Sequence, residues 1–155
     1  MITEVHDGRE MRIEPVVEKL PAEFDILRAE ARAEDHHFLD RLANDWGSGA
    51  MRFTEPGEAF LAAYSGDTLA GVGGLTIDPV VPGALRMRRF YVRRSFRRSG
   101  IARSIAATLL NKAFTTTSVV HLNAALDSIP FWESLGFMPE QDAGHTHILR
   151  RVRTS

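Results

Sequence analysis

Six consecutive residues, Arg97-Arg98-Ser99-Gly100-Ile101-Ala102, combine the groups that bind a polyphosphate. They stand between a strand-like run and a strongly helical one. The first turn of a helix leaves backbone N–H groups without intrahelical partners, at the positive end of the helix dipole. Gly100 and Ala102 leave room for a phosphate to approach those amides, and the neighbouring guanidinium groups, including that of Arg103, would add charge-assisted hydrogen bonds. The segment therefore predicts a pyrophosphate-binding turn.

The charge distribution also indicates an anionic partner for this part of the chain. Residues 1–82 contain seven Arg or Lys against sixteen Asp or Glu, whereas residues 83–155 contain twelve against four. Eight of the seventeen arginines lie between Arg86 and Arg103. Polyphosphate, nucleic acid and anionic lipid are all compatible with such a cluster, as is a solvated surface.

Several kinds of chemistry are excluded or disfavoured by composition. The chain has no cysteine, which excludes a disulfide scaffold, a thiolate metal site and a catalytic thiol. His145 and His147 stand two apart on an expected strand, but the sequence offers no third ligand beside them, so we expect no metal site. Residues 1–16 carry no apolar run typical of a signal peptide, and nowhere do eighteen apolar residues occur together, so we expect a cytoplasmic protein.

Hydrophobic periodicity predicts one domain over residues 11–155, preceded by a loose tail at residues 1–10. The pattern predicts an α/β fold with a mixed sheet and helices on both faces. The most strongly marked helix starts directly after the arginine-rich turn. We expect strands at residues 11–16, 58–64, 69–77, 85–92 and 119–124, followed by a final antiparallel pair of strands, one from residue 137 and one at 145–152. We expect helices that start at residue 21 and that cover residues 38–46, 101–113 and 129–135.

Three segments with this order and spacing resemble successive signatures of the GNAT family of N-acetyltransferases. They are Arg89-Phe90-Tyr91-Val92, Arg97-Arg98-Ser99-Gly100-Ile101-Ala102-Arg103 and Phe131-Trp132-Glu133-Ser134-Leu135-Gly136-Phe137. The resemblance is specific over residues 85–137. It implies a mixed, mostly antiparallel sheet and the transfer of an acetyl group from acetyl-coenzyme A to a primary amine of a small molecule or peptide.

The resemblance also assigns residues to the cofactor. The backbone of Phe90, Tyr91 and Val92 would pair with the pantetheine arm, and the amide of Phe90 or Val92 would polarise the thioester carbonyl. The turn would bind the pyrophosphate through the residues Arg97, Arg98, Ser99, Gly100, Ile101, Ala102 and Arg103.

The catalytic acid departs from the family pattern. Trp132 stands where the family usually has a tyrosine that protonates the leaving thiolate, and indole has no proton to give. Ala125 likewise replaces a frequent asparagine. Ser128 and Tyr91 are the candidates we rank first, with Asp127 also close in sequence. Helix capping by Ser128 and simple packing of Tyr91 are the structural alternatives.

The acceptor pocket in this family is shaped by the leading helices. Glu34, Asp35 and His36 fall at their junction, near Glu30 and His37, and their carboxylates suit a cationic acceptor; a solvated charged face is the alternative.

A homodimer is among the allowed assemblies, whereas no membrane or nucleic-acid partner is expected. Two other functions remain open: a non-catalytic coenzyme A sensor, which Trp132 permits, and nucleic-acid binding through the arginine cluster.

Overall fold

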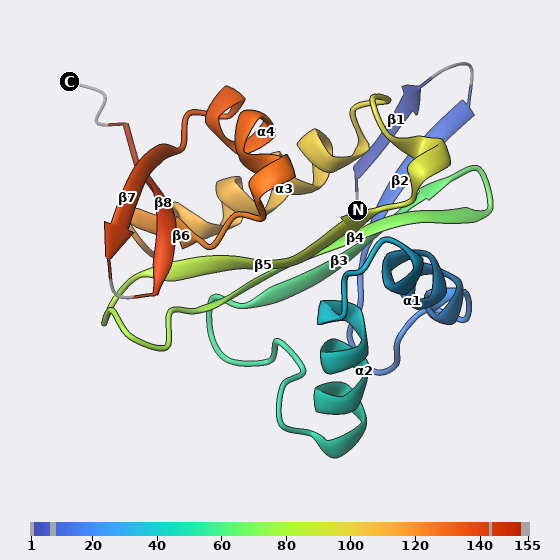
Figure 1. Ribbon diagram of the computed structural model, residues 1–155, viewed down its shortest axis with the longest axis horizontal. Coiled ribbons are helices and arrows are strands. Elements are labelled where there is room, and N and C mark those ends of the chain that lie inside the picture. Colours follow the sequence, from blue (N-terminus) through green and yellow to red (C-terminus); the bar gives the residue numbers. More distant parts are fainter. Residues whose placement is uncertain (1, 7–8, 143, 153–155) are drawn as a thin grey trace.

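The computed structural model describes residues 2–6, 9–142 and 144–152, and it confirms the α/β fold with helices on both faces of one sheet (Figure 1). Eight strands follow the order β1-β2-β3-β4-β5-β6-β8-β7. All neighbouring strands are antiparallel except β5 and β6, which are parallel. The strands are β1 (Ile2–His6), β2 (Arg9–Pro15), β3 (Ala59–Ser65), β4 (Thr68–Ile77), β5 (Leu85–Val92), β6 (Val119–Leu122), β7 (Met138–Asp142) and β8 (His145–Arg150).

The helices divide between the two faces of the sheet (Figure 1). The first pair covers one face and the second pair the other. They are α1 (Phe24–Ala33), α2 (Phe38–Ser48), α3 (Ile101–Ala113) and α4 (Ile129–Ser134), with 3₁₀ turns η1 (Arg94–Phe96) and η2 (Leu126–Ser128). Among the described residues, none of these helices has the length and apolar character needed to cross a membrane.

Each face has its own apolar core, and the sequence periodicity predicted both. On the α1 and α2 face, the buried helix residues are Phe24, Leu27, Ala31, Leu39, Leu42 and Trp46. On the other face, α3 buries Ile101, Ile105, Ala106, Leu109 and Ala113. Gly49, with φ +80°, ends α2 in the left-handed conformation that glycine adopts without strain.

One strand at the N-terminus differs from the sequence prediction. Residues 1–10 were expected to contain no element, but Ile2–His6 forms β1, which pairs with β2 from Ile2 opposite Ile13 to His6 opposite Arg9. Periodicity gave no signal here because the segment is short and half polar. Residues 1, 7 and 8 lie outside the described part of the chain.

The sheet splits beside its centre. β5 runs along β4 over most of its length, but it pairs with β6 only at Leu85, Arg86 and Met87. Since β6 ends at Leu122, opposite Met87, the second half of β5 has no strand partner on that side within the described part of the chain. The chain continues from this half of β5 through η1 to the start of α3.

Candidate active site

A β-bulge in β5 determines which face its last residues occupy. Val72 on β4 stands opposite Tyr91 and Gly74 opposite Arg88, so Arg89 and Phe90 together face Gly73. Arg89 has φ +62°. Leu85 and Met87 belong to the core beneath α3, and in a regular strand Tyr91 would follow them. The extra residue instead turns Phe90 and Val92 to that core and Tyr91 to the core beneath α1 and α2.

The backbone of Val92 faces the split between β5 and β6. The amide of the next residue, Arg93, donates to the carbonyl of Ala70 on β4 at 2.8 Å. Because backbone groups of successive strand residues point to alternate sides, the Val92 N–H and C=O point away from β4. The Val92 carbonyl accepts a hydrogen bond from Arg97 Nε at 2.9 Å. Of the two amides predicted to meet the thioester, that of Val92 is therefore directed into the opening.

The turn before α3 leaves its backbone amides without a side-chain cap. Arg98 and Gly100 have φ +63° and +86°, and none of the described side chains caps the helix. The Ser99 hydroxyl donates to the carbonyl of Phe96 instead. The first intrahelical bond joins the Ser104 amide to the Gly100 carbonyl at 3.0 Å, so the three preceding amides of the helix point outward.

The guanidinium groups expected at this turn separate in the structure. Arg97 turns back to α1 and binds Glu34, with Nη1–Oε2 and Nη2–Oε1 distances of 2.8 and 2.5 Å. Arg103 donates to the Ser134 hydroxyl at 2.9 Å, and Arg98 is exposed beside the turn. The Arg97 side chain is therefore directed away from the turn, and of the three arginines only Arg98 and Arg103 keep side chains that are not paired with a carboxylate of α1 or its C-terminal cap.

Tyr91, Glu34 and Arg97 form one network on the α1 side. Tyr91 is 5% exposed, and its hydroxyl donates to Glu34. The ion pair with Arg97 lowers the pKa of Glu34 to about 2, against the effect of burial and with help from Tyr91. Burial and the adjacent Glu34 carboxylate raise the pKa of Tyr91. Near neutral pH the carboxylate is therefore ionised and the phenol protonated, with its proton directed at Glu34.

The other catalytic candidate, Ser128, lies across the sheet from Tyr91. It occupies the N-terminal cap position of α4, but its hydroxyl donates to the carbonyl of Ala125 at 2.8 Å and caps nothing. Trp132 is buried, with its ring centroid 4.9 Å from those of Phe90 and Phe131. The structure therefore places Ser128, not Tyr91, on the face that carries α4 and Trp132.

The acidic residues at the junction of α1 and α2 differ in their contacts: two are paired with arginines and one is exposed. Glu34 is paired with Arg97, and Glu30 with Arg93 at 2.7 Å. The Asp35 side chain is 98% exposed. The His36 ring packs on Phe38 with 5.7 Å between centroids. Much of the negative charge expected to attract a cationic acceptor is thus neutralised by arginines from the second half of the chain.

Sequence reasoning gave no separate role to Arg88 and Arg89, which are half-buried just before Tyr91. Burial lowers the pKa of both, with a further contribution from neighbouring arginines that include Arg41 of α2, and the pKa of Arg89 falls to about 10. The available signal was a pair of adjacent arginines inside a strand whose other residues, apart from Arg86, are apolar or aromatic. Their charge lies beside α2, on the side where the acceptor pocket was predicted.

The arginine cluster as a whole does not form one continuous basic surface. Arg86 contacts Asp78 at 3.3 Å, and Arg93 and Arg97 pair with Glu30 and Glu34. A nucleic-acid backbone would need these charges to be available together.

Comparison with known proteins agrees with this geometry. Residues 20–137 match the model of the acetyltransferase (GNAT) family. No curated protein matches the chain. A crystal structure from Exiguobacterium sp. 255-15, assigned provisionally as an acetyltransferase, is 25% identical with a TM-score of 0.83, over 90% of this chain and 93% of that one. An acetyltransferase from Streptococcus agalactiae 2603 has a TM-score of 0.70 at 13% identity, over 90% and 98% of the two chains.

Proposed function

The chain belongs to the GNAT family of acetyltransferases, and on that premise we propose that it transfers an acetyl group from acetyl-coenzyme A to a primary amine of a small molecule or peptide. The observation that carries the proposal is the split beside β5, which opens onto the uncapped first turn of α3. A ligand that combines an extended amide-bearing arm with a diphosphate fits both features at once.

The residues around the split fit the parts of coenzyme A. The unpaired edge of β5 offers hydrogen bonds to the pantetheine amides, as a further strand would, and the Val92 N–H would polarise the thioester carbonyl. The outward amides at the start of α3 would bind the diphosphate, with Arg98 and Arg103 alongside. The bound thioester supplies the activated acetyl group.

The two catalytic candidates take different roles in this proposal. Ser128 lies on the face that carries α4, so it would pass a proton to the departing thiolate, directly or through water. Tyr91 donates to Glu34 on the opposite face and would position that carboxylate near the acceptor. Coenzyme A thiolate is a fair leaving group, so the absence of a tyrosine at position 132 is compatible with catalysis.

The ionisation of the network bears on the acceptor. With a pKa of about 2 and its charge paired with Arg97, Glu34 is a weak base for the acceptor amine. Direct attack needs the neutral amine, and deprotonation at pH 7 costs about 1.4 kcal/mol for an α-amine of pKa 8 but about 4.6 kcal/mol for a lysine-like amine. We therefore propose acceptors whose amine pKa lies near 8.

The test combines binding and turnover. Acetyl-coenzyme A affinity is measured by calorimetry, and thiol release is followed with amino acids, peptides, polyamines and aminoglycosides as acceptors. Gly100→Val should abolish binding, because a β-branched residue is strained at φ +86° and would crowd the diphosphate. Gly49→Val is the matched control, since Gly49 has φ +80° but ends α2.

Three outcomes separate the candidate functions. Binding with acceptor-dependent thiol release supports the proposal. Tight binding with no release across the panel would show a coenzyme A sensor. Unchanged affinity in Gly100→Val would reject the diphosphate site at α3.

A further inference from the structure

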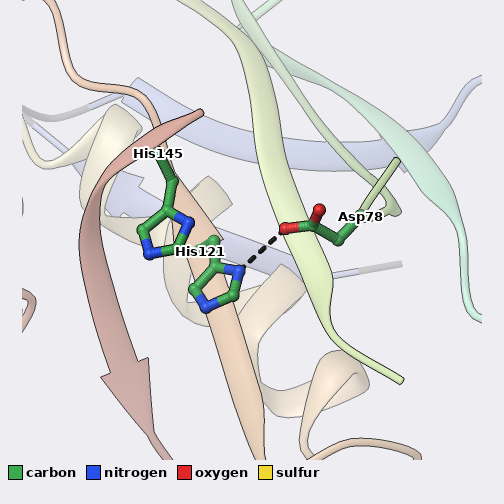
Figure 2. Close-up of side chains that lie close together, drawn as sticks. All are labelled: Asp78, His121 and His145. Carbon is green, nitrogen blue, oxygen red and sulfur yellow. Dashed lines mark hydrogen bonds and ion pairs between the residues drawn. The ribbon is translucent and has the colours of Figure 1, made fainter. Parts of the chain in front are cut away.

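A second group of chemically competent side chains lies at the end of the β5–β6 pairing opposite to the split. Asp78 directly follows β4, His121 lies in β6 and His145 begins β8. All three are buried, with exposures of 4%, 3% and 4%. Figure 2 shows the two imidazole rings stacked on each other, with Asp78 beside His121. Nothing in the proposed acetyl transfer uses them.

The three side chains present their ligand atoms to one another. His121 Nδ1 lies 2.7 Å from Asp78 Oδ2, and the two rings lie 3.7 Å apart at an interplanar angle of 7°. One nitrogen of each histidine and one oxygen of Asp78 all lie within 4.8 Å of one another. His147, which the sequence paired with His145, is not part of the group; its ring bonds to Glu133 and Thr146.

The hydrogen bonding of His145 leaves one nitrogen unused. Its Nε2 lies 3.0 Å from Glu140 Oε1, whereas its Nδ1 is fully buried and has no hydrogen-bond partner among the residues that the structure describes. If Nε2–H donates to the carboxylate, Nδ1 carries a lone pair inside the protein. This is the arrangement of metal-binding histidines, whose second nitrogen donates to a carboxylate that fixes ring and tautomer.

Asp78 is suited to the same task. Its buried carboxylate accepts hydrogen bonds from the amides of Val80 and Val81 at 2.8 and 3.0 Å and lies 3.3 Å from Arg86 Nη2, contacts that favour the ionised form. An ionised carboxylate with two imidazoles is a donor set typical of zinc and similar divalent ions.

We propose that Asp78, His121 and His145 form a binding site for a divalent transition metal of the zinc class, with Glu140 orienting His145. Ligand atoms at about 2.0–2.1 Å from a tetrahedral ion stand about 3.3 Å apart, so atoms that now lie within 4.8 Å of one another draw together, and the stacked rings tilt towards the ion. The ion replaces the His121–Asp78 hydrogen bond, and the proton of that bond moves to the other ring nitrogen of His121, so that the imidazole binds in its neutral form. The ion would then neutralise the negative charge of Asp78, which Arg86 neutralises in the metal-free chain.

The surroundings provide access and space for a fourth ligand. A pocket of about 460 Å³ is lined by Val81, His121, Glu140 and His145 among others. Water from this pocket can complete the coordination. The ion would join the loop after β4 to β6 and β8, three segments far apart in sequence, so its effect is a stabilisation of this end of the sheet.

The test uses the full chain after treatment with a chelator, titrated with zinc chloride in a calorimeter and followed by thermal unfolding. We expect one ion per chain and a rise in Tm. Glu140→Gln should weaken binding about 10–100-fold, as second-shell changes do. His145→Gln removes a ligand and should weaken binding more than that. Magnesium chloride is the comparison salt. Because Mg²⁺ prefers oxygen ligands, it should neither bind at this site nor raise the Tm.

His147→Gln is the matched control, because His147 is equally buried and lies two residues further along β8. This variant should bind zinc like the original chain. Circular dichroism verifies that each variant is folded. The proposal is overturned if the original chain takes up no zinc, or if His145→Gln and His147→Gln bind it alike.

Discussion

At the scale of single residues, the proposed acetyl transfer depends on which group protonates the departing thiolate. Trp132 cannot supply it, and Ser128 and Tyr91 lie on opposite faces of the sheet. Removing only the hydroxyl group of Ser128 or of Tyr91 therefore tests two different roles with substitutions of equal size.

Ser128→Ala should lower kcat by about 10²-fold, the lower end of what a positioned acid contributes, with little change in KM for the acceptor. Tyr91→Phe keeps the buried ring but removes the hydrogen bond to Glu34, so it should act mainly on KM for the acceptor. Steady-state kinetics at saturating acetyl-coenzyme A separates the two parameters. An unchanged kcat in Ser128→Ala would mean that solvent protonates the thiolate.

At the scale of elements, the bulge in β5 depends on a close approach that only glycine allows. A Cβ at Gly73 would lie 2.8 Å from both the Phe90 ring and Ile105. Gly73→Ala should therefore destabilise the protein by about 1–3 kcal/mol, the usual cost of overpacking, and weaken acetyl-coenzyme A binding by displacing Phe90. Urea unfolding measures the first effect and calorimetry the second.

Gly47→Ala is the control with the opposite expected sign. Gly47 lies inside α2 with nothing within 4 Å of an added Cβ, so alanine should stabilise by about 0.5–1 kcal/mol. If both substitutions stabilise, the packing of Phe90 against Gly73 does not constrain the bulge.

The same strand shows what the sequence could and could not predict. The alternation of Leu85, Met87 and Tyr91 with their neighbours is imperfect, and residues 85–92 were still predicted correctly as a strand. The irregularity is the bulge at Arg89, which moves Tyr91 to the other face. Local periodicity fixes the type of an element, but the face reached after a bulge depends on the neighbouring strand.

At the scale of the whole molecule, the contrast between an acidic and a basic half has an internal explanation. The ion pairs Glu30–Arg93, Glu34–Arg97 and Asp78–Arg86 each join the two halves. The sequence showed the surplus of each sign, but not that folding would bring these residues together. The turn before α3 was predictable because all of its groups lie within seven consecutive residues, whereas the network of Tyr91 with Glu34 joins residues 57 positions apart.

These pairs make stability sensitive to acid. The carboxyl groups of Glu34 and Asp78 have pKa values of about 2 in the folded chain, below their ordinary values of 4.5 and 3.8. A carboxyl with a lowered pKa stabilises the fold above its unfolded pKa, and this contribution is lost as pH falls through the folded value. In metal-free buffer, the free energy of unfolding should therefore fall between about pH 5 and pH 2.

Glu34→Gln assigns part of that loss to one network. The variant should be less stable than the original chain at pH 7 by about 1–3 kcal/mol, because Arg97 and Tyr91 lose their ionised partner. The difference should shrink towards pH 2, where the original carboxyl is itself becoming protonated. Urea unfolding at a series of pH values measures both curves. Parallel curves across this range would show that the ionisation of Glu34 does not contribute to acid sensitivity.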